Sequence, residues 1–333
     1  MRLLIAYNAS GKKNCPSDPD FLSENAVQDE VTAVYHAAQE LGYHPQCYPV
    51  AELEKTIRDI REMAPEVIFN LCEGFQGTAR FEMHIAALWD LMGIAYTGNT
   101  PITLGLAQDK VLTKRVLESR KIHTPAYQVF KQIPDKTMLE FPLITKPSRE
   151  DASLGIDTRA VAHTLTQLER SVERLLNKYK QPILVERYIA GREFNISLLG
   201  NPPVVLAVSE IDFSSLPASE PKIAGYEAKW IPNHPLYLKT PVHCPAKIPA
   251  ELKERLEDVA IQVFTVLGGR DYGRVDTRVD REGRIYVLEF NPNPDISADA
   301  GFSKAVRAAG VRYQDFIEQV VQMAMNRKAY DQV

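Results

Sequence analysis

A stretch near the carboxyl end of the chain, Gly273–Asp295, reads GRVDTRVDREGRIYVLEFNPNPD. Tyr272–Val279 and Arg284–Asn291 are both rich in β-branched and aromatic residues, which favour strands. The four residues Asp280–Gly283 between them are polar and are typical of a turn. The spacing predicts an antiparallel β-hairpin, around which the rest of the chain can be organised.

Alternation along the two predicted strands brings charged and amide side chains to one face. Residues two apart in a strand share a face. The residues grouped in this way are Arg274, Asp276 and Arg278 on the first strand and Glu289 and Asn291 on the second.

The two groups meet only in one register of the hairpin. We expect Val279 to pair with Arg284, which sets Arg274 opposite Glu289. A slip by one residue would move every side chain of one strand to the other face. A site shared by both strands therefore requires this register.

Two carboxylates and an amide oxygen on one surface suit a hard cation. Asp276, Glu289 and Asn291 offer oxygen ligands, and Mg²⁺ binds oxygen at roughly 2.0–2.1 Å. For each residue alone, an exposed strand with a cross-strand salt bridge is the better explanation. For the group it is weaker, because Glu289 follows the apolar run Tyr286–Leu288, where a carboxylate is costly unless it is paired or coordinated.

Composition excludes several classes of protein. The 333 residues exceed what one compact core usually holds, so two or three domains are expected. A net charge of −4 gives no reason to expect nucleic acid or membrane as a partner, and no run approaches the roughly 18 apolar residues of a membrane span. The start MRLLIAYNAS fits a first strand better than a signal peptide. The four scattered cysteines favour free thiols in a reducing cytoplasm.

The first third of the chain alternates between strand and helix patterns. Arg2–Tyr7 is predicted as a buried strand, and apolar residues at helical spacing follow as far as Leu41. A second strand is expected at Val67–Leu71 and another helix over residues 80–92. This rhythm predicts a Rossmann-like parallel sheet over roughly the first 105 residues. Because no GxGxxG follows the first strand, a dinucleotide role is not expected.

The remaining two thirds predict a mixture of helices and strands. Helices are expected at 109–119, 164–178, 253–267 and 314–327, and strands at 141–146, 183–188 and, in two parts, 193–209. Residues 210–250 carry seven prolines and little periodicity. A long irregular segment of this kind is usually functional or mobile.

Two further stretches carry polar groups at the ends of predicted strands. The loop Lys146–Gly155 begins with a lysine and continues with small, polar residues, a composition that can fold over a polyphosphate. Glu186 follows the apolar run Ile183–Val185, and Glu193 lies seven residues beyond it, so a carboxylate there could accept from ribose hydroxyls. Taken singly, each stretch is explained as well by a surface turn or an exposed acid.

The order of these residues along the chain resembles that of the ATP-grasp superfamily, and most closely the D-alanine–D-alanine ligases. The matching positions are Tyr96-Thr97-Gly98, Asp109-Lys110, Lys146–Glu150, Glu186, Gly191, Glu193, Tyr226–Lys229, Gly273-Arg274, Asp276, Leu288-Glu289 and Asn291. The resemblance is weaker over residues 8–82. The resemblance implies a three-domain architecture that combines α/β and α+β units. The domains would be an N-terminal Rossmann-like domain (1–107), a central α+β lid (108–190) and a C-terminal domain with the metal site (191–333).

The resemblance also implies a role for each matching residue. Nucleotide contacts would come from Lys110, Lys146, Ser153, Lys229, the hinge residues Glu186, Arg187, Tyr188 and Ile189, and the ribose acceptor Glu193. Asp276, Glu289 and Asn291 would hold two Mg²⁺ ions, with Mn²⁺ as a substitute. Arg274, Lys229 and Ser153 would act at the reacting centre. The candidates for substrate contacts are Glu24, Arg149, Asn293 and Asp295.

Several substrate positions depart from the family pattern. The first of two adjacent serines in the family's phosphate loop is Ala152 here, and a tyrosine after the closing-loop lysine is Trp230. Asp295 places a negative charge where an acceptor carboxylate would approach, which favours a cationic or neutral acceptor group. ATP and metal positions match the family, whereas positions for D-alanine differ.

We therefore expect an ATP- and Mg²⁺-dependent ligase that forms a C–N bond between small amino-acid-like substrates through a phosphorylated intermediate, releasing ADP and phosphate. A D-alanine–D-alanine ligase proper, a ligase of mycosporine type and a non-catalytic ATP-binding protein stay as alternatives. Small molecules are the expected partners, with a homodimer as a candidate assembly.

Overall fold

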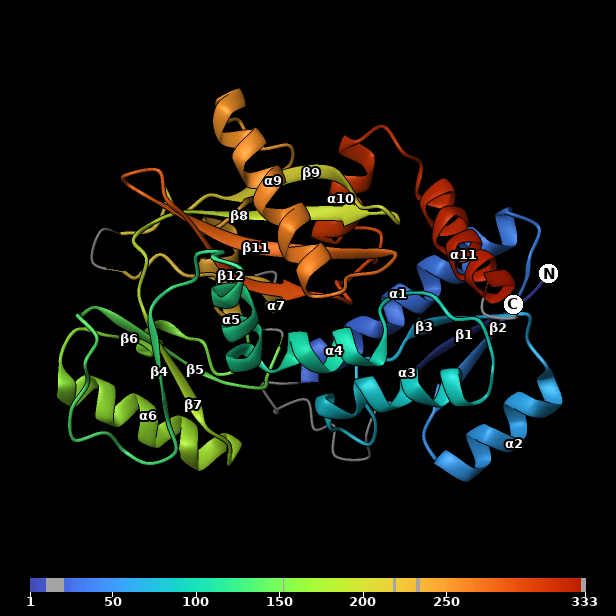
Figure 1. Cartoon of the computed structure of the whole chain (residues 1–333), viewed down its shortest axis with the longest axis horizontal. Coiled ribbons are helices and arrows are strands. Elements are labelled where there is room, and N and C mark those ends of the chain that lie inside the picture. The colour runs from blue at the N-terminus through green and yellow to red at the C-terminus, as the bar shows by residue number, and fades with distance from the viewer. Residues whose placement is uncertain (10–20, 152, 218–219, 232–233, 331–333) are drawn as a thin grey trace.

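The computed structural model describes residues 1–9, 21–151, 153–217, 220–231 and 234–330. Its strands form three sheets of three, four and five strands, with helices around them (Figure 1). Ala152 lies outside the described residues, and so do the side chains of Glu24 and Trp230, whose backbones are helical. Among the described helices, none combines the length and the apolar character that a membrane span needs.

The amino-terminal sheet is parallel and has helices on both faces. Its strand order is β2-β1-β3. The elements that build it are β1 (Arg2–Asn8), α1 (Phe21–Glu40), β2 (His44–Val50), α2 (Leu53–Met63), β3 (Val67–Leu71), η1 (Ala79–Phe81) and α3 (Glu82–Leu91). Leu3 and Ile5 pack toward α1, whereas Leu4 and Ala6 pack toward α2 and α3. Burial on both faces explains why these strands are apolar throughout.

The parallel sheet predicted for this region is confirmed, but two of its elements were not predicted. Strand β2 contains Pro45 and Pro49, which cannot donate to a ladder and obscured the strand pattern. It lies at the edge of the sheet, where proline is tolerated. Helix α2, which follows it, was also missed.

The middle of the chain forms an antiparallel sheet in the order β4-β7-β5-β6. Its elements, with the two helices that precede it, are α4 (Pro101–Gln108), α5 (Lys110–Ser119), β4 (Tyr127–Phe130), β5 (Leu143–Pro147), η2 (Thr158–Ala160), β6 (Val161–Ala162), α6 (Leu165–Tyr179) and β7 (Ile183–Arg187). Helix α6 packs Leu168 and Val172 against Leu143 and Val185. By alternation, Lys146 and Glu186 belong to the opposite face.

The largest sheet has the order β10-β9-β8-β11-β12. Its region consists of β8 (Gly191–Leu199), β9 (Val204–Ile211), α7 (Tyr226–Trp230), α8 (Pro235–Lys239), β10 (Val242–His243), α9 (Ala250–Val266), β11 (Tyr272–Asp280) and β12 (Ile285–Asn291). Helix α9 crosses one face (Figure 1) and buries Val263 and Phe264 against Val275. Leu117 of α5 joins the same core, so α5 packs on this sheet, and the predicted boundary at residue 108 stays a prediction.

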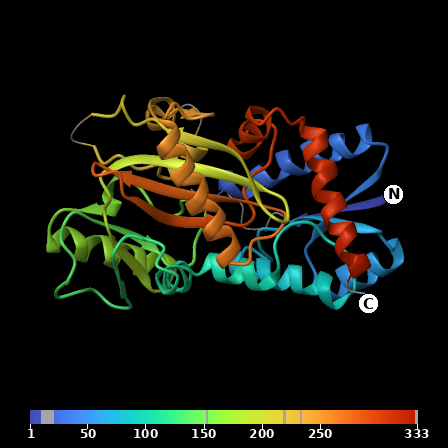
Figure 2. The ribbon, with the colours of Figure 1, turned by 45° about the horizontal axis from the view of Figure 1, so that its top comes forward.

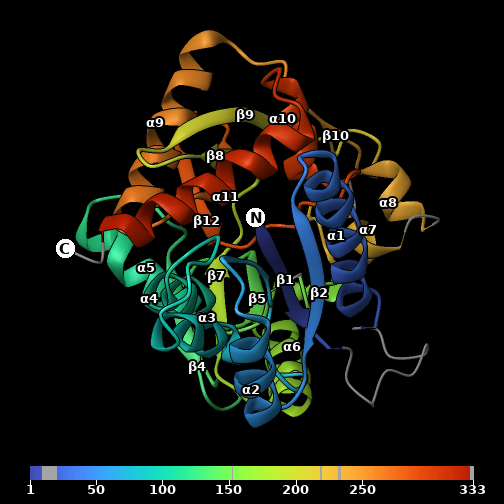
Figure 3. The same ribbon diagram turned by 90° about the vertical axis from the view of Figure 1, so that its right-hand side faces the viewer.

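The last two helices return to the first sheet. Helices α10 (Gly301–Ala308) and α11 (Tyr313–Tyr330) contribute Phe302, Phe316 and Val320 to the core that contains Leu3 and Phe69. Figure 2 and Figure 3 show α11 on the side of the molecule where the chain begins. The first and last parts of the chain therefore share one core.

Candidate active site

The hairpin β11–β12 forms, but its turn differs from the prediction. Val279 pairs with Ile285 instead of Arg284. The Asp280 carboxylate accepts from the backbone N–H groups of Glu282 and Arg284, at 3.0 and 2.9 Å. These bonds close the turn one residue further along than the β-propensity pattern indicated. The predicted register is therefore wrong at this end of the hairpin.

A bulge at Leu288 shifts the register a second time. Beyond the bulge Asp276 lies directly opposite Glu289, and Arg274 lies opposite Asn291 rather than opposite Glu289 as predicted. Without the extra residue, alternation would bring Leu288 to the face of Asp276 and turn Glu289 to the other side. The two carboxylates thus share one face, although by a pairing that was not predicted.

The carboxylates of Asp276 and Glu289 have different partners. Arg274 donates from Nε and Nη2 to the two oxygens of Asp276, at 2.7 and 2.9 Å. Asp276 is only 4% exposed and Arg274 is half-buried, so this ion pair is largely withdrawn from water. Glu289 faces Lys110, whose Nζ lies 3.6 Å from Oε2.

The donor set on this face is made of oxygen atoms. Asn291 Oδ1 accepts from the backbone N–H of Asn293 at 3.0 Å, which orients the amide. Counting only His, Cys, Asp and Glu, the described residues contain no group of three that could hold a metal. A metal here would depend on Asp276, Glu289 and the amide oxygen. That set fits Mg²⁺, which takes one or two carboxylates and completes its shell with water and phosphate oxygens.

Glu289 is surrounded by cations. Burial raises its pKa, but the positive charges of Lys110, Lys229, Lys146 and Arg274 outweigh burial and lower the pKa to about 2. Lys110 responds in the opposite sense: burial lowers its pKa, and the neighbouring carboxylates raise it further than burial lowers it. This part of the site therefore holds an ionised carboxylate among charged lysines, an arrangement suited to a polyphosphate and a metal.

Glu186 holds Lys146 from the interior of the protein. Its carboxylate is 1% exposed and forms ion pairs with Lys146 at 2.6 Å and with Lys114 at 2.5 Å. Burial raises the pKa of Glu186, but the two ammonium groups lower it overall. Burial lowers the pKa of Lys114 to about 8. Sequence reasoning missed Lys114, although its place four residues after Lys110 puts both on one helix face.

The phosphate loop is hydrogen-bonded both to helix α5 and to the segment before helix α7. Lys110 Nζ donates to the Glu150 carbonyl at 2.6 Å and to Asp151 Oδ1 at 3.1 Å. Ser153 has a φ of 59°, in the left-handed region, and its Oγ donates to the Ala224 carbonyl at 3.1 Å. The loop thus bridges helix α5 and the segment that precedes α7.

Helix α7, which carries Lys229, lies against the phosphate loop through a close backbone contact. A Cβ on Gly225 would come within 2.6 Å of the Ile156 carbonyl oxygen, so a larger residue requires a shift. The Tyr226 N–H donates to the same carbonyl at 3.1 Å. The irregular segment 210–250 therefore contacts the chain at the end of the phosphate loop.

The predicted hinge is joined to Glu193 by Arg278. Arg278 Nη1 donates to the Ile189 carbonyl at 2.7 Å, and Nε and Nη2 donate to Glu193 Oε2 at 3.0 and 2.8 Å. The Tyr188 ring lies with its centroid 5.1 Å from the guanidinium carbon. Arg187 is exposed. Hinge and ribose candidates are therefore neighbours, as the resemblance implies, and their contacts with a nucleotide stay predictions.

The substrate candidates do not gather in one place. Asn293 Nδ2 donates to Glu82 Oε1 at 3.1 Å, beside the amino-terminal sheet. Asp295 Oδ1 accepts from a backbone N–H two residues further on, at 2.8 Å. Arg149 instead donates from Nε to Asp109 Oδ2 at 2.9 Å, at the N-cap of α5. The Asn293–Asp295 end is accordingly the candidate substrate end of the site.

Three glutamates that sequence reasoning missed lie near Asn293 or Asp295. Glu30 on α1 is 4% exposed and accepts from the Ile296 N–H at 2.8 Å. Glu73 follows β3, and Glu82 begins α3. Burial, and after it neighbouring carboxylates, raise the pKa of all three, that of Glu73 to about 8. Position was the available signal, since ligands of α/β sheets bind beyond the carboxyl ends of strands.

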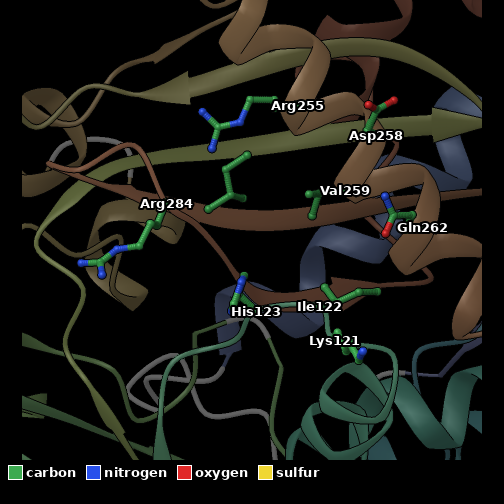
Figure 4. Close-up of a pocket in the computed structure, with 9 residues that line it drawn as sticks. Lys121, Ile122, His123, Arg255, Asp258, Val259, Gln262 and Arg284 are labelled. Atoms are coloured by element: carbon green, nitrogen blue, oxygen red, sulfur yellow. The ribbon is translucent and has the colours of Figure 1, made fainter.

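Two cavities lie outside the group of lysines and carboxylates. One of about 350 Å³, between α9 and the β12 end of the hairpin, is lined by residues that include Lys121, His123, Arg255 and Gln262 (Figure 4). None of its lining residues was a predicted site residue. The other, of about 510 Å³, lies beside Tyr188 and the first residues of β8.

Comparison with known proteins adds evidence independent of this geometry. The family described as "D-ala D-ala ligase C-terminus" matches residues 104–322. The uncharacterized protein y4sG of Sinorhizobium fredii is 34% identical over 322 residues, covering 94% of this chain and 91% of the relative. The D-alanine–D-alanine ligase of Marinomonas sp. is 32% identical over 301 residues, covering 86% and 88%. The crystal structure of D-alanine–D-alanine ligase from Bacillus anthracis complexed with ATP covers 99% of both chains with a TM-score of 0.78 at 19% identity, a likeness of fold alone.

The fold is that of an ATP-grasp protein. More particularly, the chain belongs to the D-alanine–D-alanine ligase family, and it is an ATP-dependent ligase of the carboxylate–amine type. The family resemblance inferred from the sequence is therefore confirmed, and the alternative of a non-catalytic ATP-binding protein is not retained. The roles of individual residues and the identity of the substrates stay predictions.

Proposed function

We propose that the protein is an ATP- and Mg²⁺-dependent ligase that joins a small carboxylate to an amine through an acyl phosphate and releases ADP and phosphate. One observation carries this proposal. Asp276 and Glu289 lie opposite each other on one sheet face, and lysines from three other elements surround Glu289. Two carboxylates for a metal beside several cations for phosphates are the parts that phosphoryl transfer needs.

The nucleotide would lie among groups from helix α5, from the four-stranded sheet with its phosphate loop, and from the region of the five-stranded sheet. Its phosphates would contact Lys110, Lys146, Ser153 and Lys229, its adenine the backbone of the hinge, and its ribose Glu193. The support is positional: Lys146 is fixed by Glu186 at 2.6 Å, and the segment that carries Lys229 contacts the phosphate loop through Ser153 and Ala224. The Glu186 side chain binds two lysines inside the protein, and its backbone lies in β7 between β4 and β5, so the adenine contacts would come from the hinge residues that follow it.

Asp276, Glu289 and Asn291 would hold the Mg²⁺ ions. When bound, Mg²⁺ offsets the negative charge of the transferring phosphate. Mn²⁺ has the same preference for oxygen donors and would serve as a substitute. The low pKa of Glu289, about 2, keeps this carboxylate ionised and ready to coordinate throughout the neutral range.

The reaction would proceed in two steps. An oxygen of the substrate carboxylate attacks the γ-phosphorus of ATP, the bond to ADP breaks, and an acyl phosphate forms. The amine nitrogen then attacks the acyl carbon, phosphate leaves, and the nitrogen loses a proton. Arg274 is half-buried beside Asp276 and would stabilise the oxyanion of the tetrahedral intermediate. The phosphate loop and α7 would exclude water, which would otherwise hydrolyse the acyl phosphate.

The substrate pair would not be D-alanine with D-alanine. At the substrate end, Glu30, Glu73 and Glu82 lie near Asp295, and carboxylates raise the pKa of one another there. An approaching cation would lower these pKa values and ionise the acids, so the lining favours an amine or another cationic group over an acceptor carboxylate. The second candidate is a D-alanine–D-alanine ligase proper, favoured by the relative of that name from Marinomonas sp. at 32% identity.

A phosphate-release assay tests both candidates. The protein would be given ATP and Mg²⁺ with D-alanine alone, and then with panels of L-amino acids, small amines and larger carboxylate or keto cores, including cyclohexenimine cores. We expect release to depend on an amine from the panels and on Mg²⁺. Robust D-alanyl-D-alanine synthesis at millimolar D-alanine would overturn the substrate proposal and establish the second candidate. No release with any panel would contradict the proposed reaction.

A further inference from the structure

Arg278 is a buried cation whose donors all point to groups at the nucleotide end. It is 4% exposed and lies directly opposite Glu193 across β11 and β8. Nε and Nη2 donate to Glu193 Oε2, Nη1 donates to the Ile189 carbonyl, and Nη2 also donates to the Lys222 carbonyl. A guanidinium carries its N–H donors in one rigid plane, so a single side chain sets the relative position of three segments.

Two aromatic rings enclose the same guanidinium. The ring centroids of Tyr188 and Phe213 lie 5.1 and 5.6 Å from its central carbon. The Tyr188 hydroxyl is also bound to Lys222, because it accepts from the Lys222 N–H at 3.0 Å and donates to the Lys222 carbonyl at 3.2 Å. The Lys222 backbone is therefore held on the hinge by Arg278 and Tyr188 together.

Lys222 begins the short stretch of chain that leads to Lys229. Along this stretch the Ala224 carbonyl accepts from Ser153 Oγ at 3.1 Å. The Tyr226 N–H donates to the Ile156 carbonyl, just beyond the phosphate loop. The stretch is thus attached at its start to Arg278 and in its middle to the loop 153–156. Its far end carries Lys229 in helix α7, the lysine that the proposed function assigns to the phosphates.

We infer that Arg278 is a positioning residue that couples recognition of the ribose to the placement of Lys229 at the phosphates. Arg278 contacts only Oε2 of Glu193, which leaves Oε1 for a ribose hydroxyl. The same side chain anchors Lys222, so a nucleotide that engages Glu193 also stabilises the stretch 222–229. This inference rests on the proposed function, since the ribose role of Glu193 belongs to it.

The test compares wild type with Arg278→Met and Arg278→Lys. KM and kcat would be measured by phosphate release with ATP, 2′-deoxy-ATP and 3′-deoxy-ATP. Amide hydrogen exchange of residues 222–231 would be followed with and without a non-hydrolysable ATP analogue. We expect Arg278→Met to raise KM for ATP at least about tenfold, because Glu193 and Lys222 lose their common partner. Wild type should prefer ATP over at least one deoxy analogue, and this preference and the nucleotide-dependent protection should shrink in the variant.

Arg278→Lys should recover part of both effects, because an ammonium can still reach Glu193 but cannot serve three acceptors in one plane. The matched control is Arg284→Met, an arginine of the same hairpin that pairs with Asp280 and Glu282 at the exposed turn. It should leave KM, the ribose preference and the protection of residues 222–231 unchanged. If Arg278→Met does not fold, the lysine variant carries the same measurements.

Calorimetry of wild type with the ATP analogue separates this inference from the proposed function. If wild type binds no adenine nucleotide, the proposed function fails, and the inference fails with it. If wild type binds and turns over ATP while both Arg278 variants keep its KM, its ribose preference and its exchange protection, Arg278 serves the fold alone. The inference would then be overturned while the proposed function stands.

Discussion

The metal end and the substrate end of the site both contain glutamates, but the pKa values of these glutamates are shifted in opposite directions. At the metal end, Glu289 has its pKa lowered to about 2, and at the substrate end, Glu73 has its pKa raised to about 8. Burial raises the pKa of both. The difference lies in their neighbours, since lysines surround Glu289, whereas Asp295 and Asp151 lie near Glu73.

This contrast indicates what each end is built to receive. The metal end has a surplus of fixed cations, which an anionic polyphosphate would neutralise. At the substrate end, burial and after it neighbouring carboxylates are the leading causes of the raised pKa values of Glu30, Glu73 and Glu82. A cationic group entering there would lower these pKa values and ionise the acids beside it. Each end therefore lacks the charge that its proposed ligand brings.

Removing the carboxylate at the metal end should produce the largest effect. Glu289→Gln keeps the shape of the side chain but removes its charge, so phosphate release should fall by about 1,000-fold, measured with saturating substrates. The variant should still fold, with a lower Tm because Lys110 loses a carboxylate partner. The matched control is Glu282→Gln at the exposed hairpin turn, which should keep wild-type activity. Near-normal turnover in Glu289→Gln would show that Glu289 is not a metal ligand. The interpretation of this end of the site as the metal end would then be wrong.

The lysine pair behind the metal end offers the next test. Lys114→Met leaves the buried Glu186 carboxylate with Lys146 as its single ammonium partner, so the free energy of unfolding should fall by about 3 kcal/mol. Chemical denaturation measures the loss. Arg115→Met, on the exposed side of the same helix, is the control. Equal stability of the two variants would show that Glu186 does not need its second cation.

The substrate end should respond to pH in the opposite sense to an ordinary ion pair. Glu73 binds a proton more tightly in the folded protein, so it stabilises the fold fully below pH about 4.5, and this contribution is lost as pH rises through about 8. Glu73→Gln should therefore match wild type at pH 5 and exceed it at pH 8 by about 3 kcal/mol, roughly 4 °C in Tm.

Melting curves of both proteins at pH 5, 6.5 and 8 measure this difference. Glu62→Gln, an exposed glutamate on α2, is the control and should show no such trend. A difference between Glu73→Gln and wild type that stays constant with pH would mean that Glu73 is solvated like Glu62, and the contrast between the two ends would disappear.

The smallest expected effect concerns the contact between the phosphate loop and the stretch before α7. Ser153→Ala removes a neutral hydrogen bond to the Ala224 carbonyl, so kcat/KM for ATP should fall by about threefold. Ser119→Ala, which removes a similar bond at the end of α5, should have no effect on turnover. A loss far above tenfold would indicate that the proposed contact of Ser153 with the phosphates outweighs its bond to the Ala224 carbonyl.

The parts of the fold that follow local rules could be predicted from the sequence. Hydrophobic periodicity located α6, α9 and α11, and alternation grouped Asp276 with Arg274 and Arg278 on one face. The family order of residues then led to the correct class of enzyme. Periodicity and alternation depend on residues close together in the chain, and the family order depends only on which residues follow one another along it. One sequence therefore contains all three signals.

The remaining features depend on contacts between distant residues. The bulge at Leu288 leaves no mark in the alternation pattern, and the register prediction failed there. Lys114 becomes notable only because β7 brings Glu186 to it, and Glu30 only because the chain near Asp295 returns to α1. In each case the partner lies far away in sequence, and composition cannot say which residues meet.

The return of α10 and α11 to the first sheet has a consequence for how the chain folds during synthesis. Leu3 and Phe69 emerge early from the ribosome, but Phe316 and Val320, which cover the same face, emerge last. Until then, one apolar face of the growing amino-terminal sheet lacks part of its cover and is exposed to chaperones or to other nascent chains. An arrest of translation before residue 313 should therefore yield a fragment that associates with chaperones, whereas release of the whole chain would end that dependence.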